Sequence, residues 1–289
     1  MPGECLGVVG ESGSGKSVTF LSVLGLVKPP GRIESGQIRF DGRDLARLTP
    51  TELRAVRGRD IAMTMQDALT ALNPALRVEE QIVETILAHD RLPRLAARSK
   101  ALDMLRLLGI PDPERRIRDY PHQFSGGMRQ RVMIAIALAC RPRLLIADEP
   151  TTALDVTIQA QVLDLIAAMR RDLGMSVVLI SHNLGVVAEH CDRVALMYAG
   201  QVVETGPTRA IIDRPRHPYT QGLLRSMPVL SDLDRPLVPI PGQVPSLVDL
   251  APECRFLPRC GQAAPECRRE IPLLSMGEAH AARCIRVAA

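Results

Sequence analysis

Short apolar runs alternate along the chain with longer segments in which apolar residues recur at helical spacing. Residues 4–9, 144–148 and 177–181 are apolar runs of strand length and predict buried strands. Residues 16–26 predict a helix, and a crossover helix between the last two strands is predicted by Ile158, Val162, Leu165 and Met169. This alternation indicates an α/β fold, with a mostly parallel sheet covered by helices.

Two regions depart from this alternation. Residues 78–140 show helical patterns without a convincing buried strand, as over 128–140, and predict an α-helical subdomain. It is inserted between the two parts of the sheet domain, residues 1–77 and 141–226. Residues 227–289 are rich in proline, which keeps helices and strands short, and predict a separate irregular module.

The composition indicates a globular protein and argues against two kinds of direct contact. Hydrophobic residues make up 46% of the chain but aromatic residues only 2%, so aliphatic packing must supply most of the core. The net charge of +4 comes from 36 basic and 32 acidic residues spread along the chain, without the basic run typical of nucleic-acid binding. The longest apolar run, residues 132–140, is too short to cross a bilayer, and no secretion signal is evident. We therefore expect a cytosolic protein that contacts the membrane through another protein.

Residues 10–17 fit the phosphate-loop pattern of Gly, four residues, then Gly-Lys-Ser, between a predicted strand and a predicted helix. Its glycines let backbone N–H groups converge on phosphate oxygens at the start of a helix. Lys16 is expected to hold the β- and γ-phosphates of ATP, and the Ser17 hydroxyl to ligate Mg²⁺. The loop residues expected at the nucleotide are Gly10, Ser12, Gly13, Gly15, Lys16 and Ser17.

Polar residues end or follow three of the apolar runs. Asp148 and Glu149 end one strand, where Asp148 suits a contact to Mg²⁺ and Glu149 a general base for the attacking water. Alone, such a pair is equally compatible with a solvated strand end. His182 and Gln66 each follow another apolar run and are also open to a purely structural interpretation. Their order and spacing relative to the phosphate loop favour a site.

The order of these motifs resembles that of the ATP-binding cassette (ABC) family. Ser125, Gly126 and Gly127 match its signature at a helix start, followed by Asp148-Glu149, Ala153-Leu154-Asp155 and His182. The resemblance implies a P-loop NTPase fold in which residues 1–77 and 141–226 form the ATP-binding core and two subunits pack head to tail. It implies that Ser125 and Gly127 serve the partner's γ-phosphate, that Asp155 spans the dimer contact, that His182 holds the γ-phosphate in its own site, and that Gln66 contacts Mg²⁺.

A narrower resemblance is to ATP-binding subunits of dipeptide and oligopeptide importers. This resemblance rests on residues 66–74, 216–220 and 240–242, together with Pro245. It implies a second ATPase subunit, usually a paralogue, two membrane permease subunits, and indirectly an extracytoplasmic binding protein, at the cytoplasmic face of the inner membrane. The cargo stays open among dipeptides, longer peptides, glutathione and nickel complexes. A DNA-repair ATPase, a ribosome-associated ATPase and a binding-only half-site are less favoured alternatives, because this chain has one cassette, no coiled coil and an intact Glu149.

The seven cysteines fall into two groups. Cys5, Cys140 and Cys191 occur singly and are expected to be small core residues. Four others lie in the tail and suit a [4Fe–4S] cluster or Zn²⁺, although their wide spacing leaves free thiols equally open: Cys254, Cys260, Cys267 and Cys284. Similar tails in importer subunits carry an iron–sulfur cluster, so the resemblance favours that cluster over zinc.

The amino terminus is shorter than the resemblance implies. ABC cassettes normally begin well before the phosphate loop, with antiparallel strands and an aromatic residue that stacks on adenine. Here the first aromatic residue is Phe20, beyond Ser17. We therefore expect the sequence to be incomplete at its amino terminus and to lack that adenine contact.

Overall fold

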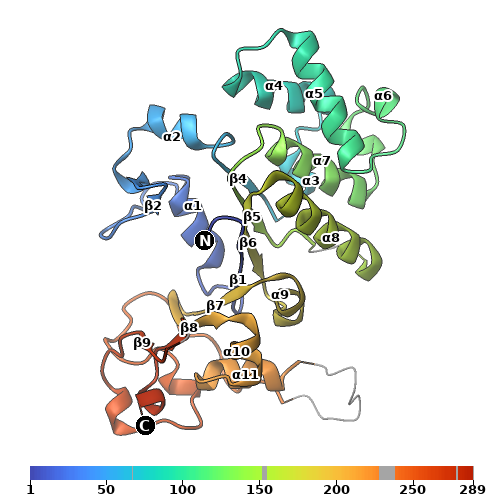
Figure 1. Cartoon of the computed structure of the whole chain (residues 1–289). Helices are drawn as coiled ribbons and strands as arrows, with labels where there is room; N and C mark the ends of the chain where they lie inside the picture. The colour runs from blue at the N-terminus through green and yellow to red at the C-terminus, as the bar shows by residue number, and fades with distance from the viewer. Residues whose placement is uncertain (67, 152–154, 228–237, 278, 289) are drawn as a thin grey trace. The chain divides into compact units, whose positions relative to one another are not determined.

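The computed structural model describes residues 1–66, 68–151, 155–227, 238–277 and 279–288 (Figure 1). The chain forms two compact units: unit 1 comprises residues 1–3 and 20–178, and unit 2 comprises residues 4–19 and 179–289. The chain passes between the units within α1 (Lys16–Val23) and β6 (Ser176–Ser181).

Unit 1 combines a small hairpin, a pair of parallel strands and most of the helices. The hairpin and the elements beside it are β2 (Arg39–Phe40), β3 (Arg43–Asp44), η1 (Leu45–Arg47) and α2 (Pro50–Val56). The parallel pair and the crossover helix are β4 (Ile61–Thr64), β5 (Leu144–Asp148) and α8 (Val156–Leu173). Between β4 and β5 lie α3 (Ala68–Ala71), α4 (Val78–His89), α5 (Arg94–Leu107), α6 (Pro113–Arg116), η2 (Pro121–Gln123) and α7 (Gly126–Leu138).

The predicted elements of unit 1 are confirmed with small changes of bounds. β5 has the predicted bounds, and β4 pairs with it in parallel from Ile61 opposite Leu144 to Thr64 opposite Ala147. Residues 78–140, which are all described, contain helices and no strand. Their apolar faces pack into a core whose fully or almost fully buried side chains include Ile82, Ile86, Leu105, Leu108 and Ile134.

The first helix is shorter than predicted. α1 ends at Val23, whereas the apolar pattern predicted a helix to residue 26. Gly25 has φ +60° and donates its N–H to Ser22, while the N–H of Leu26 donates to Leu21. This pair of bonds is a Schellman motif, in which a left-handed glycine closes the helix, so the remaining apolar residues lie beyond its end.

Unit 2 contains β1 (Cys5–Val9), β7 (Arg193–Tyr198) and β8 (Gln201–Pro207), with the helices α9 (Leu184–His190), α10 (Thr208–Asp213) and α11 (Pro218–Arg225). β1 pairs with β7 in parallel, and β8 runs antiparallel to β7. α9 lies so close to β1 that a methyl group at Gly7 would overlap the side chain of Val187. Only glycine permits this approach.

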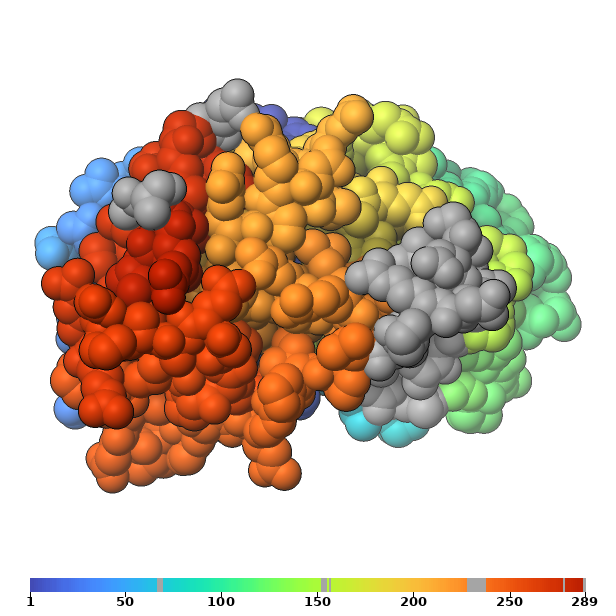
Figure 2. Space-filling view, turned by 90° about the horizontal axis from the view of Figure 1, so that it is seen from below, coloured from blue at the N-terminus to red at the C-terminus, as the bar shows by residue number. Residues whose placement is uncertain are grey.

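The tail extends this sheet with very short elements, as its prolines predict. They are η3 (Leu257–Arg259), η4 (Pro265–Cys267), β9 (Leu274–Ser275), β10 (Ala281–Ala282) and η5 (Ile285–Ala288). β10 pairs with β8, and Arg283 donates its Nε–H to the carbonyl of Val202 at 2.9 Å. Figure 2 shows the tail surface, in orange and red, continuous with the lighter orange residues of α10 and α11.

The three single cysteines are partly as predicted. Cys5 and Cys191 are buried, but they are not isolated: their Sγ atoms lie 3.4 Å apart, because Cys191 precedes β7, the neighbour of β1. Cys140 is only half-buried, since it lies just beyond the end of α7. Within the described residues, no helix has the length and apolar character needed to cross a membrane.

Candidate functional site

The phosphate-loop sequence in unit 2 forms a tight turn between β1 and α1. Gly13 and Gly15 have φ of +77° and +92°, which side chains other than glycine's rarely tolerate. A side chain at Gly10 would collide with the carbonyl oxygen of Met197 on β7. The loop is pinned to the turn after β7, because Gly200 donates its N–H to the Ser14 carbonyl at 3.0 Å. Three glycines are thus required by backbone geometry.

Lys16 lies inside this loop. Its side chain is buried, and Nζ donates to the carbonyls of Gly10 at 2.7 Å and Glu11 at 3.0 Å. The ammonium group therefore lies where the loop closes on itself, with Ser17 half-buried beside it and Ser12 and Gly13 exposed. Phosphate oxygens bound here would replace the two carbonyls as acceptors of Lys16.

His182 follows β6 directly, as predicted, and is exposed. The next residue, Asn183, fixes the turn into α9, because its Oδ1 accepts the N–H of Gly185 at 2.9 Å. His182 thus stands between the end of a buried strand and a capped helix, a position that holds its backbone firmly.

In unit 1, the ends of β4 and β5 bring Gln66 and Glu149 together. Gln66 donates its Nε2–H to Glu149 Oε2 at 3.2 Å. Asp148 is 5% exposed at the end of β5. Glu149 has φ +44°, in the left-handed region that costs a residue with a side chain roughly 1–2 kcal/mol. Strained backbone of this kind clusters at functional sites, so Glu149 is a candidate functional residue.

The signature residues and Asp155 lie at the starts of two packed helices of unit 1. Ser125 caps α7, with its Oγ accepting the N–H of Met128 at 3.4 Å, and Gly126 is the first helical residue. A methyl group at Gly127 would lie 2.8 Å from Cγ2 of Ile158 on α8. Asp155 caps α8 by accepting the N–H of Ile158 at 2.9 Å. Ala153 and Leu154, also matched by the family pattern, lie outside the described residues.

The four tail cysteines line one small cavity in unit 2, about 10 Å³ in volume, together with His217 and Phe256. Within the described residues, however, no group of three or more His, Cys, Asp or Glu side chains is arranged to hold a metal ion. Burial raises the pKa of the Cys254, Cys260 and Cys284 thiols, and the neighbouring cysteines raise it further. The cysteines therefore gather around one cavity, but the described residues lack the geometry of a formed metal site.

Residues 216–220, which the sequence connected to function only by resemblance, support the phosphate loop. The buried carboxylate of Glu204 accepts the N–H of His217 at 2.9 Å and contacts His280 Nε2 at 2.8 Å. His217 Nδ1 accepts the N–H of Tyr219 at 3.1 Å and so caps α11. The Tyr219 hydroxyl accepts the N–H of Glu11 at 3.0 Å. The polar cap before Pro218 is the sequence signal for this helix start.

Comparison with known proteins finds likenesses to two family models and to curated relatives. The family model described as ABC transporter matches residues 1–152, and the one described as oligopeptide/dipeptide transporter, C-terminal region, matches residues 203–267. The dipeptide transport ATP-binding protein DppD of Escherichia coli (strain K12) is 50% identical over 95% of this chain and 84% of its own length. DppD of Bacillus subtilis (strain 168) is 50% identical over 98% and 85%.

A solved structure agrees with these sequence likenesses. The ATP-binding cassette MJ0796, in a dimeric post-hydrolysis state bound to ADP and Pi, has a TM-score of 0.64 and 29% identity over 72% of this chain and 87% of that one.

Proposed function

The chain belongs to the ABC transporter family and carries the C-terminal region of oligopeptide and dipeptide transporters, and from this premise we propose how its residues act in transport. It is the nucleotide-binding subunit of a peptide importer, and it hydrolyses ATP to power import. The observation that most directly supports a hydrolytic role for named residues is the contact between Gln66 and Glu149.

The phosphate loop binds ATP in this proposal. The N–H groups of residues 10–17 and the ammonium of Lys16 hold the phosphates. His182 contacts the γ-phosphate. Ser17, Gln66 and Asp148 offer the hydroxyl, amide and carboxylate oxygens that Mg²⁺ prefers. When bound, Mg²⁺ neutralises charge that develops on the transferred phosphoryl group.

Glu149 acts as the general base, and Gln66 orients its carboxylate. The amide of Gln66 donates to Oε2 of Glu149 and so fixes the direction of the carboxylate that accepts a proton from water in this proposal. We expect Glu149→Gln to slow turnover of the assembled transporter by roughly 10² to 10⁴, the usual span for loss of a general base, while ATP still binds. Glu114→Gln, which changes an exposed glutamate paired with Arg106, is the matched control. Near-normal turnover of Glu149→Gln would refute the role.

Each ATP lies between two ATPase subunits in this proposal. Ser125, Gly126 and Gly127 face the partner's nucleotide, and Asp155 lies at the contact between the subunits. The helical subdomain, residues 78–140, and Gln66 transmit closure to two membrane permease subunits, with the second ATPase a paralogue. An extracytoplasmic binding protein delivers di- or oligopeptides, and this chain works at the cytoplasmic face of the inner membrane. Copurification of the four membrane-associated subunits in equal amounts tests this composition.

The four tail cysteines are the proposed ligands of a metal centre, a [4Fe–4S] cluster in the first place and Zn²⁺ as the alternative. Their arrangement around one cavity supports this, and binding would displace protons from thiols whose pKa burial has raised. Iron, sulfide and zinc analysis of protein purified without oxygen tests the proposal. Protein without iron, sulfide or zinc after such handling would reject it.

A further inference from the structure

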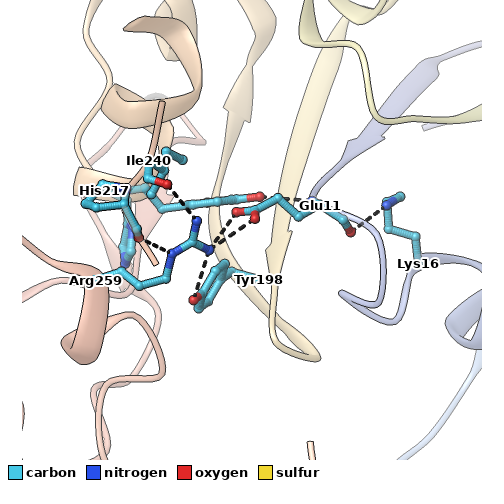
Figure 3. A network of polar contacts seen from close by, with 8 residues as sticks. Glu11, Lys16, Tyr198, His217, Ile240 and Arg259 are labelled. Carbon is cyan, nitrogen blue, oxygen red and sulfur yellow. Dashed lines mark hydrogen bonds and ion pairs between the residues drawn. The ribbon is translucent and has the colours of Figure 1, made fainter. Parts of the chain in front are cut away.

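Arg259 of the tail is buried against the phosphate loop by an unusually complete set of contacts (Figure 3). Its side chain is 4% exposed, and Nη1 lies 2.9 and 3.1 Å from the two carboxylate oxygens of Glu11. Nη1 also donates to the Tyr198 hydroxyl at 3.4 Å, while Nε donates to the carbonyl of Pro241 at 2.8 Å and Nη2 to that of Ile240 at 3.3 Å. Arg259, although distant in sequence, is thus held in direct contact with the phosphate loop.

Glu11 is the second residue of the phosphate loop, and all three of its polar groups have partners. Its carboxylate accepts from Arg259, and its N–H donates to the Tyr219 hydroxyl. Its carbonyl accepts from Lys16 Nζ at 3.0 Å and from the N–H of Ser14 at 3.2 Å. The conformation of Glu11 therefore contributes, together with the Gly10 carbonyl, to where Lys16 lies. The side chain of Glu11 is held by Arg259 of the tail.

The charge of Glu11 gives Arg259 a second effect. The Glu11 carboxylate would repel phosphates bound in the same loop. Because the Glu11 side chain is only 29% exposed, solvent screens its charge only in part. A guanidinium in contact with both oxygens cancels that charge and fixes its direction. Burial opposes the charge of Arg259, but hydrogen bonds to Tyr198 and Glu11 outweigh it and raise the pKa of the guanidinium. The guanidinium of Arg259 therefore stays charged beside Glu11.

We propose that Arg259 is a positioning residue for ATP, which acts through Glu11 to hold the phosphate loop and Lys16 in the geometry that binds phosphate. The inference rests on the proposed role of residues 10–17 as the ATP site. It assigns the C-terminal region a part in nucleotide binding. A purely structural arginine, which only ties Ile240 and Pro241 into the tail, would affect folding and leave ATP affinity intact.

The test measures the Kd for ATP and the thermal midpoint of the full chain for Arg259→Met, Glu11→Gln and the double variant. Arg259→Met should raise the Kd about 10-fold, and the same change in the Glu11→Gln background should have an effect several times smaller, as expected for two residues in one network. Arg283→Met is the matched control, because Arg283 is a part-buried tail arginine whose side chain donates to the carbonyls of Val202 and Ile271. It should leave the Kd unchanged.

Two outcomes overturn the inference: a Kd for Arg259→Met within about twofold of the unchanged chain, or an equal loss of affinity in both Glu11 backgrounds. If Arg259→Met does not fold, Arg259→Lys replaces it and is compared with Arg283→Lys. Lysine keeps the charge but has a single nitrogen, which cannot bond Glu11, Pro241 and Ile240 as the three guanidinium nitrogens do, so a smaller rise in Kd is expected. Lys16→Ala distinguishes failure of the proposed ATP site from failure of the positioning role. If Lys16→Ala binds ATP as the unchanged chain does, the ATP site itself is refuted. If Lys16→Ala loses ATP binding while Arg259→Met binds normally, only the positioning role of Arg259 is refuted.

Discussion

Acidification should destabilise unit 2 through His217. This side chain is 1% exposed, and its ring lies 5.8 Å, between centroids, from Phe256. Its Nδ1 must stay unprotonated to accept the N–H of Tyr219 at the start of α11. Burial lowers the pKa of His217 to about 4, and a hydrogen bond with the backbone of Arg283 offsets only part of this effect. The folded protein thus holds a neutral histidine well below the pH at which an exposed one is protonated.

The sign and size of the effect follow from the two pKa values. Between the ordinary value of 6.5 and about 4, the unfolded chain binds a proton at this residue and the folded chain does not. The free energy of unfolding is therefore highest above the upper value and falls as the pH falls through this window. Since one pKa unit corresponds to about 1.4 kcal/mol, the loss attributable to His217 amounts to at most ~3 kcal/mol at the lower end.

The assay is denaturant unfolding at a series of pH values between 7 and 4, compared with His217→Asn. Asparagine keeps a side-chain acceptor at the helix start but does not titrate, so the variant should be less stable at neutral pH and lose less stability on acidification. His122→Asn, which removes an exposed histidine from unit 1, is the control and should keep the full pH dependence. Parallel curves for His217→Asn and the unchanged chain would show that His217 is not the titrating group.

At two glycines, Gly127 and Gly7, even substitution by alanine should destabilise the protein. Gly127→Ala would place a methyl group 2.8 Å from Cγ2 of Ile158, and we expect a loss of about 1–3 kcal/mol in unfolding free energy together with reduced ATPase activity. Ile158→Ala in the same chain should restore part of both, and a double variant no better than Gly127→Ala would contradict this packing. Gly7→Ala should cost at least as much stability, because its methyl group overlaps Val187 between β1 and α9. Gly261→Ala, with no atom close to the added methyl group, is the control in chemical denaturation.

The parts of the fold that the sequence predicted are those in which one residue's neighbours along the chain decide its structure. The continuous apolar run Leu144–Asp148 became a strand with the predicted bounds, and the helical spacing of Val162 and Met169 became the buried face of α8. The glycines of the phosphate loop were likewise predictable, because the need for positive φ at Gly13 and Gly15 is local.

The end of α1 is a local exception, because Gly25 closes that helix. The other features that the sequence did not predict depend on contacts between distant residues. The adjacency of Cys5 and Cys191 depends on which strand pairs with β1, and the sequence pattern does not specify strand order. The same holds for the close approach of Gly127 to Ile158, which requires two helices to pack at one point. For the tail, prolines predicted short elements correctly but gave no indication that residues distant from the loop would reach it.

The Arg-His-Pro-Tyr sequence at residues 216–219 matches a family pattern, but the sequence alone does not show what these residues contact. Pro218 starts α11, His217 caps it, and the carboxylate of Glu204 accepts the N–H groups of Arg216 and His217. The start of α11 places the Tyr219 hydroxyl where it accepts the N–H of Glu11 in the phosphate loop. Since Tyr219 and the tail's Arg259 hold the same loop residue from two directions, weakening either contact should loosen Lys16. Tyr219 and Arg259 therefore belong to one mechanical unit, although about 40 residues separate them in the sequence and neither belongs to a nucleotide-binding motif.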